Sequence, residues 1–232
     1  MRRLWPVVLI AVVAVIPVWR AALTGEMVGA FDQIRQMKPW NGPSPEAPWD
    51  VLQADSVLQF YPWRDMVLRA WRDLEIPGWN PSELAGTPLL ANSQSGGLYP
   101  PHVLLGLIFV PTPIAVNLLA WFHLFVAGLG AYALARQLNA SRPGGALAGV
   151  SFALSAFMVS WTALPSVPST AAWTPWCLWA VLRMSPAREP GPKLSERLGK
   201  CLLLADFVAL AEECERQERE LRNEANRYPK PL

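Results

Sequence analysis

The sequence predicts an all-α integral membrane protein with about four transmembrane helices and a large extracytoplasmic loop after the first of them. Of the 232 residues, 52% are hydrophobic and only 16% are charged, whereas an ordinary soluble domain carries about 25% charged residues. Between residues 84 and 182 the formal charges are Arg136 and Arg142 alone. A soluble surface cannot be built from so few charges, so this composition excludes a cytosolic enzyme, a nucleic-acid binder and a disordered chain.

Four apolar stretches are candidate membrane spans, because about 20 apolar residues cross the hydrocarbon core. The first, 1–23, begins with arginines and is predicted to stay in the membrane as a signal anchor. The residues after Trp19 fit a cleavage site poorly, and a cleaved signal peptide is the alternative. The second span, 113–135, and the third, 144–164, contain no charged residue. The fourth, 166–184, has the shortest uncharged run, close to the lower limit for a span.

The basic residues indicate an orientation, because short cytoplasmic loops carry an excess of Lys and Arg. With four spans, the arginines before the first span, Arg136 with Arg142, and the basic residues near the C-terminus all fall on one side. We therefore predict a multi-pass protein of the cell membrane, with both termini cytoplasmic and residues 24–102 extracytoplasmic. Residues 103–111 are too short to cross and are expected to form an interfacial or re-entrant helix. Residues 185–232 are predicted to be a charged, helical cytoplasmic tail.

An amphipathic helix is predicted at 56–75, within the extracytoplasmic loop. Tryptophans lie on its apolar side, which suits a membrane interface. Asp65 and Arg69 are spaced to form an ion pair on its polar side, and the plain interpretation of Arg64 is likewise ion pairing at the helix surface. Asp55 immediately precedes the helix, so one interpretation of this carboxylate is a helix N-cap.

Small residues within the spans indicate a packed bundle. Gly145, Gly149 and Ala153 repeat every four residues, a spacing that lets helices approach closely in lipid, although small residues are also common in spans generally. His123 is expected to make a hydrogen bond within the bundle. The tryptophans from Trp173 to Trp179 are expected to form an aromatic belt in contact with lipid.

The second half of the extracytoplasmic loop is dense in Pro, Gly, Asn, Ser and Gln, which are the residues of fixed turns. Amide side chains beside Trp and Tyr are typical of sites that bind sugar hydroxyls and stack on sugar rings, but any extracytoplasmic loop is polar and rich in turns. The amide candidates are Gln59, Asn80, Asn92 and Gln94, and the candidates for stacking are Trp63 and Trp79.

Several ordered motifs resemble those of the YfhO family of bacterial membrane proteins. The loop carries D-x-x-x-Q-F-Y-P-W from Asp55, P-x-W-N-P from Pro77, and G-T-P-L-L-A-N-x-Q-S-G-x-x-Y-P-P from Gly86. The spans carry H-L-F-V-A-G-L-G-A-Y from His123 and F-A-L-S-A-F-M-V from Phe152. The resemblance extends over about residues 4–182 and rests on the agreement of all these motifs in order.

The resemblance implies a GT-C-like N-terminal module. GT-C glycosyltransferases move a sugar from a polyprenyl-phosphate donor to a cell-envelope polymer, such as a teichoic acid, on the outer face of the membrane. In these enzymes an acidic residue of the first outer loop is the usual catalytic base, and Asp55 occupies the matching position. The implied partners are membrane lipid, the polyprenyl-phosphate sugar and the polymer acceptor; no nucleic acid is expected.

In such a reaction a carboxylate takes the proton of the attacking hydroxyl, and the phosphate that leaves requires a cation. The candidates for that cation are Arg64, Arg69 and His102. No cofactor is indicated, and a divalent metal is not excluded. The alternatives are a non-catalytic membrane protein that binds lipid or a partner through the loop, and a transporter, which ranks last because the spans lack buried Asp, Glu or Lys.

Members of this family are several times longer than this chain and contain around a dozen spans. The sequence is therefore expected to be a fragment, a frame-disrupted product, or a short relative whose fold is completed by a membrane partner protein.

Overall fold

The computed structural model describes residues 4–41 and 53–184. Within these ranges the protein is helical, has no β-strand and contains one isolated β-bridge, between Asn80 and Thr87. Three helices are long and apolar enough to cross a membrane: Trp5–Thr24, Thr112–Gln137 and Arg142–Ser160. The all-helical membrane class and three of the four predicted spans are therefore confirmed by length and composition.

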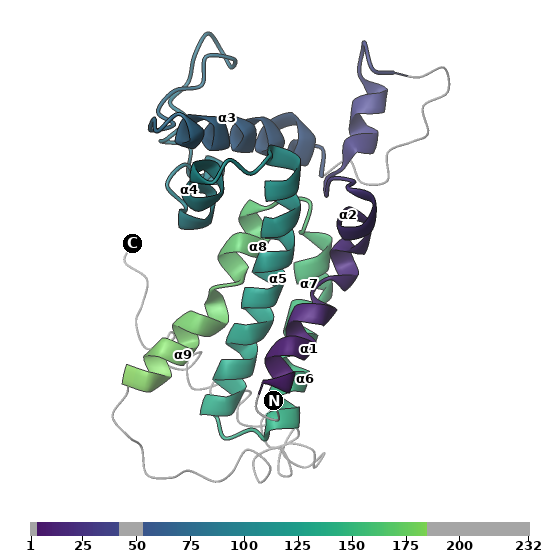
Figure 1. Ribbon diagram of the computed structural model, residues 1–232, viewed down its shortest axis with the longest axis vertical. Coiled ribbons are helices and arrows are strands. Elements are labelled where there is room, and N and C mark those ends of the chain that lie inside the picture. The colour runs from purple at the N-terminus through teal and green to yellow at the C-terminus, as the bar shows by residue number, and fades with distance from the viewer. Residues whose placement is uncertain (1–3, 42–52, 185–232) are drawn as a thin grey trace, which may run out of the picture.

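Two of these three spans contain local irregularities. The first consists of α1 (Trp5–Val13), a short 3-10 helix η1 (Ile16–Val18) and α2 (Trp19–Thr24). The third consists of α6 (Arg142–Ala153) and α7 (Ala156–Ser160), and Ser155 caps α7 by accepting a hydrogen bond from the amide of Met158. In contrast, α5 (Thr112–Gln137) is continuous and lies at the centre of the bundle (Figure 1).

The predicted fourth span is divided into two helices, α8 (Ser166–Ala171) and α9 (Thr174–Met184). Pro175 lies in the first turn of α9, where its missing amide hydrogen is tolerated, and a proline disfavours helical geometry in the residue before it. Pro175 therefore fits the start of a new helix. Neither helix is long enough to cross a bilayer alone, so the structure does not confirm four transmembrane helices. Figure 1 shows α8 and α9 running beside α5.

The core of the bundle consists of small and aliphatic side chains: Ala14, Val18, Ala120, Leu124, Ala127, Met158 and Ala172. The close approach that the small residues predict occurs where α5 meets α6. A Cβ atom added to Gly128 would lie 2.9 Å from the carbonyl oxygen of Gly149, and one added to Gly149 would lie 2.7 Å from that of Gly128. These two glycines therefore allow backbone-to-backbone contact between α5 and α6.

A helical cap covers one end of the bundle. It contains the π-helical turn η4 (Ser56–Phe60), α3 (Tyr61–Arg72) and α4 (Pro100–Leu107). Figure 1 shows α3 lying across the end of α5, with α4 beneath it. The cap and the bundle are tied together by a hydrogen bond of 2.6 Å from the Thr112 hydroxyl to Asp65.

The predicted amphipathic helix at 56–75 thus corresponds to η4 and α3, and the predicted short helix at 103–111 corresponds to α4, which begins earlier. A Cβ atom at Gly106 would lie 2.5 Å from that of Trp71, so this glycine lets α4 pack directly on α3. Two 3-10 helices, η2 (Phe31–Gln36) and η5 (Ser93–Ser95), complete the described helices. The predicted tail at 185–232 lies outside the described residues.

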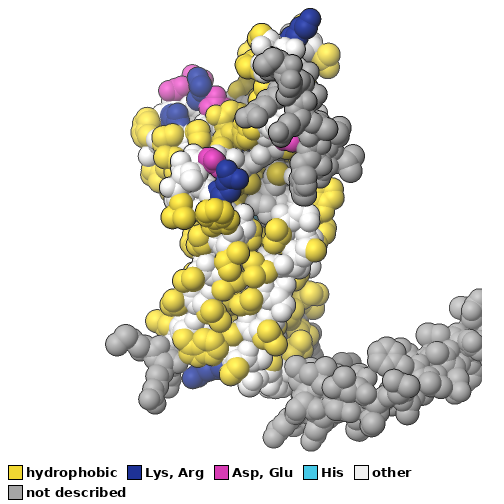
Figure 2. Space-filling model, turned by 90° about the vertical axis from the view of Figure 1, so that its right-hand side faces the viewer, with side chains coloured by type: hydrophobic (Ala, Val, Ile, Leu, Met, Phe, Trp, Pro, Cys, Tyr) yellow, Lys and Arg dark blue, Asp and Glu magenta, His cyan; other side chains and the backbone are white. Residues whose placement is uncertain are grey.

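The surface agrees with a membrane protein. Figure 2 shows hydrophobic side chains over the flank of the bundle, whereas the charged side chains visible on that face lie toward its two ends. Lipid tails require such an apolar flank, because charged groups are costly within the hydrocarbon region.

Candidate functional site

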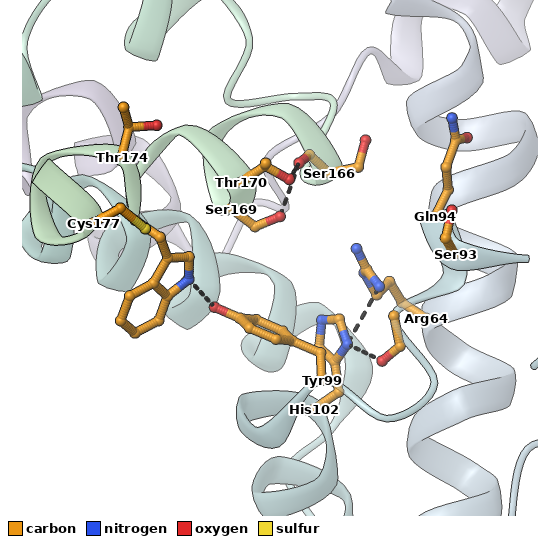
Figure 3. A pocket seen from close by; sticks show the side chains of 12 residues that line it. Arg64, Ser93, Gln94, Tyr99, His102, Ser166, Ser169, Thr170, Thr174 and Cys177 are labelled. Atoms are coloured by element: carbon orange, nitrogen blue, oxygen red, sulfur yellow. Dashed lines mark hydrogen bonds between the residues drawn. The ribbon is translucent and has the colours of Figure 1, made fainter. Parts of the chain in front are cut away.

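A cavity of about 520 Å³ lies where the cap meets α8 and α9. Its walls come from α3, from the loop that leads into α4, and from the α8–α9 segment, which is far away in sequence (Figure 3). Its lining residues are Arg64, Ser93, Gln94, Gly96, Tyr99, His102, Ser166, Ser169, Thr170, Trp173, Thr174 and Cys177. The cavity is the best candidate for a binding site because it combines a buried cation with many hydroxyl groups.

Arg64 is buried at the edge of this cavity, with only 4% of its surface exposed. Its Nη1 donates to the carbonyl oxygen of Ser95. Among the described residues Arg64 has no ion-pair partner. Burial lowers the pKa of its guanidinium to about 10, and the group is still charged at neutral pH. Because it is buried and has no ion-pair partner among the described residues, Arg64 is not the surface ion-pairing residue that the sequence predicted. An unpaired buried charge is costly to a fold.

Gly96 lets the loop close over Arg64. Its φ of +62° is left-handed, a conformation that glycine adopts at little cost. A Cβ atom there would lie 2.5 Å from Nη1 of Arg64 and 2.6 Å from Cε1 of His102. Both the backbone conformation and the available space therefore require glycine at this position.

His102 is also buried, with 2% of its surface exposed. Its Nδ1 lies 2.7 Å from the carbonyl oxygen of Gly96, which can only accept a hydrogen bond, so Nδ1 carries the proton. Nη1 of Arg64 lies 3.3 Å from the same nitrogen, but both groups are then donors, and this contact is not a hydrogen bond. Burial, together with the charge of Arg64, lowers the pKa of His102 to about 3. The imidazole is therefore neutral, and the positive charge of the cavity is that of Arg64.

A chain of three aromatic side chains links the loop before α4 to α5 and to the segment between α8 and α9. The indole of Trp173 donates to the hydroxyl of Tyr99 at 3.2 Å, and that hydroxyl lies 2.9 Å from Nε2 of His123. The His123 ring also makes a hydrogen bond to the backbone of Leu119, which in the neutral ring places the proton on Nδ1, so Nε2 accepts the proton of Tyr99. His123 was expected to make a hydrogen bond within the bundle, whereas this side-chain partner, Tyr99, belongs to the loop of the cap.

The tryptophans expected to form a lipid-facing belt are directed partly into the protein. The indole of Trp173 bonds to the cap, and that of Trp176 donates to the carbonyl oxygen of Val126 on α5 at 2.9 Å. Trp176 can reach this carbonyl because Gly130 leaves room; a Cβ atom there would lie 2.6 Å from the indole nitrogen. These two side chains therefore hold α9 against the rest of the protein.

Asp55 and Arg69 lie outside the cavity lining. The Asp55 carboxylate is exposed and accepts a hydrogen bond of 3.1 Å from the side chain of Gln59, and it makes no capping hydrogen bond to the helix that follows. Arg69 forms the predicted ion pair with Asp65 at 2.8 Å. Asp55 and Arg64 are separated by more than two turns of helix, so the structure does not bring these two candidates together.

The amide candidates of the loop mostly maintain its turns. The buried Asn80 accepts a hydrogen bond from the amide of Ser82 at 2.9 Å, and Asn92 accepts one from the amide of Gln94 at 3.1 Å. Gln94 itself borders the cavity. Of the two stacking candidates, Trp63 is buried and bonded to Glu83, whereas Trp79 is 58% exposed.

Sequence reasoning did not include Tyr99 or the α8 hydroxyls among the site residues. Three hydroxyl residues share one side of a helical turn within an otherwise apolar stretch: Ser166, Ser169 and Thr170. This spacing could have indicated a polar helix face at the site. In the part of the chain that the structure describes, no cluster of His, Cys, Asp and Glu could hold a metal ion.

Comparison with protein-family models, with curated proteins and with solved structures finds no match for this chain. The likeness of its motifs to those of the YfhO family therefore stays a prediction from the sequence.

Proposed function

We propose that this protein binds a polyprenyl-phosphate sugar in the cavity and, as a GT-C-type glycosyltransferase, transfers the sugar to a cell-envelope acceptor. The observation that carries the proposal is the buried guanidinium of Arg64, which has no acidic partner among the described residues. A cation held in this way is poised for an anionic ligand, because a bound phosphate would supply the missing counter-charge.

The position of the cavity suits a ligand that is anchored in the membrane. The cavity lies at the end of the bundle where α4 leads into α5, one of the three apolar helices. In the proposed topology α8 and α9 together form the fourth crossing, the cap faces the outside and both termini face the cytoplasm. A lipid phosphate at the outer surface would then lie at the level of Arg64.

In the proposed reaction the acceptor hydroxyl attacks the anomeric carbon, the bond from that carbon to the phosphate oxygen breaks, and the lipid phosphate leaves with the bonding electrons. Arg64 would stabilise the charge that develops on this phosphate. The role of Asp55 as the base that takes the hydroxyl proton comes from the resemblance alone.

A second function is favoured by the position of Asp55, which is exposed, bonded to Gln59 and absent from the cavity lining. In this alternative the protein binds the lipid phosphate without catalysing transfer, or acts together with a membrane partner protein that completes the fold.

The two functions can be separated by measuring binding and turnover in the reconstituted protein. Wild type, Asp55→Asn and Arg64→Gln are compared with Arg69→Gln, a matched control on the same helix whose side chain is exposed. The probes are farnesyl phosphate and farnesyl phosphate that carries a sugar. For the enzyme, Asp55→Asn abolishes transfer and keeps binding, whereas Arg64→Gln weakens binding more than tenfold and Arg69→Gln has little effect.

For the alternative, the binding results are the same but wild type shows no transfer. Absence of binding by wild type, or equal weakening by Arg64→Gln and Arg69→Gln, would contradict both functions.

A further inference from the structure

The cavity offers several hydrogen-bond acceptors. The hydroxyls of Ser169 and Thr170 both donate to the carbonyl oxygen of Ser166 at 2.9 Å, and the Tyr99 proton is directed to His123. Each of these hydroxyl groups has therefore used its proton within the protein. Their oxygen atoms can therefore accept hydrogen bonds from a ligand through their lone pairs.

His102 contributes another acceptor, on a nitrogen. Because Nδ1 carries the proton and donates to Gly96, Nε2 of the neutral ring has a lone pair. None of the described residues hydrogen-bonds to Nε2, and the residue borders the cavity. In Figure 3 this second nitrogen is on the side of the ring turned away from the contacts with Gly96 and Arg64.

These groups together define the chemistry of a matching ligand. A ligand with one anionic group for Arg64 and hydroxyl hydrogens for these acceptors matches them. Nη1 of Arg64 lies 3.3 Å from Nδ1 of His102, and Nε2 is on the other side of the same small ring, so a ligand that reaches both Arg64 and Nε2 carries its anionic group and that hydroxyl close together. In a glycosyl phosphate, the hydroxyl on the carbon next to the phosphate-bearing carbon meets this requirement.

We propose that His102 is a specificity-determining residue, whose Nε2 accepts a hydrogen bond from the sugar hydroxyl adjacent to the phosphate while Arg64 binds the phosphate itself. This inference rests on the proposed binding of a lipid-linked sugar phosphate. It assigns recognition of the sugar to the cavity, rather than to the loop amides, most of which maintain turns.

The test compares farnesyl phosphate with farnesyl phosphoglucose on the full-length protein in nanodiscs. In His102→Asn the amide nitrogen can replace Nδ1 as donor to Gly96, but no atom replaces Nε2. We expect this variant to bind farnesyl phosphoglucose about tenfold more weakly than wild type, the effect of one lost buried hydrogen bond, and to bind farnesyl phosphate equally well. Arg64→Gln is the control that weakens binding of both probes.

A second measurement uses wild type alone, so it does not depend on the folding of a variant. Farnesyl phosphate carrying 2-deoxyglucose, which lacks the adjacent hydroxyl, should bind about tenfold more weakly than farnesyl phosphoglucose. Equal affinity for these two sugars, or an equal effect of His102→Asn on both original probes, overturns the role of His102 while the proposed function stands. Failure of wild type to bind any of the probes overturns both.

Discussion

Replacing Arg64 with methionine should leave the stability of the fold unchanged or slightly higher while weakening phosphate binding. Burial lowers the pKa of this guanidinium from 12.5 to about 10. At about 1.36 kcal/mol per pKa unit, holding it charged in the folded state costs about 3 kcal/mol. Its hydrogen bond to the Ser95 carbonyl offsets about 1.5–3 kcal/mol of this cost. Methionine has a similar length and removes both effects, so the free energy of unfolding should stay the same or rise by up to about 1.5 kcal/mol.

The assay is denaturant unfolding of the solubilised protein, together with the affinity for farnesyl phosphate. We expect the affinity to fall by about tenfold to a hundredfold, because a charge-assisted hydrogen bond contributes about 1.5–3 kcal/mol. Arg69→Met is the matched control, and it should change neither quantity appreciably because that ion pair is exposed. A loss of more than about 3 kcal/mol of stability in Arg64→Met would refute the reasoning, because Arg64 would then be needed for the fold itself.

Three further predictions concern single positions. Gly96→Ala should destabilise the protein by at least about 1–2 kcal/mol, the cost of a left-handed conformation with a Cβ atom, and should weaken phosphate binding; unfolding and binding measurements check this, and a neutral result would contradict the packing around that glycine. The pKa of His102 is lowered from 6.5 to about 3 by burial and by Arg64, so between these pH values the unfolded chain binds more protons; stability should fall by about 2–3 kcal/mol from pH 7 to pH 4.5, and His102→Asn should show a smaller fall. Gly149→Val should separate α5 from α6 and lower the melting temperature, and an unchanged melting temperature would show that the two backbones are not in close contact.

The transmembrane part of the fold was largely predictable, because hydropathy depends on local sequence alone. Three predicted spans and the amphipathic helix correspond to helices in the structure. The fourth predicted span is divided in the structure, since its length is near the limit and α9 begins as a new helix with Pro175 in its first turn. The sequence also predicted that another helix approaches closely at Gly149. It did not identify Gly128 on α5 as the residue that Gly149 contacts.

The candidate site was harder to predict, because it depends on contacts between distant segments. On a helical wheel Arg64 belongs to the polar side of α3, but in the structure segments distant in sequence, among them the loop around Gly96, cover it. The α8 hydroxyls become part of a site only because α8 packs beside the cap. Asp55 was singled out by motif resemblance, which carries no information about distances, and the structure places it outside the cavity lining.

The two walls of the cavity also impose an order on the biosynthesis of the protein. One wall includes Arg64 and the loop into α4, the other belongs to α8 and α9, and two apolar helices lie between them in sequence. During synthesis from the N-terminus, Arg64 reaches the membrane before the second wall of the cavity has been synthesised. A nascent chain that stops before α8 therefore has no complete cavity, and ligand binding would report that the last described helix has docked.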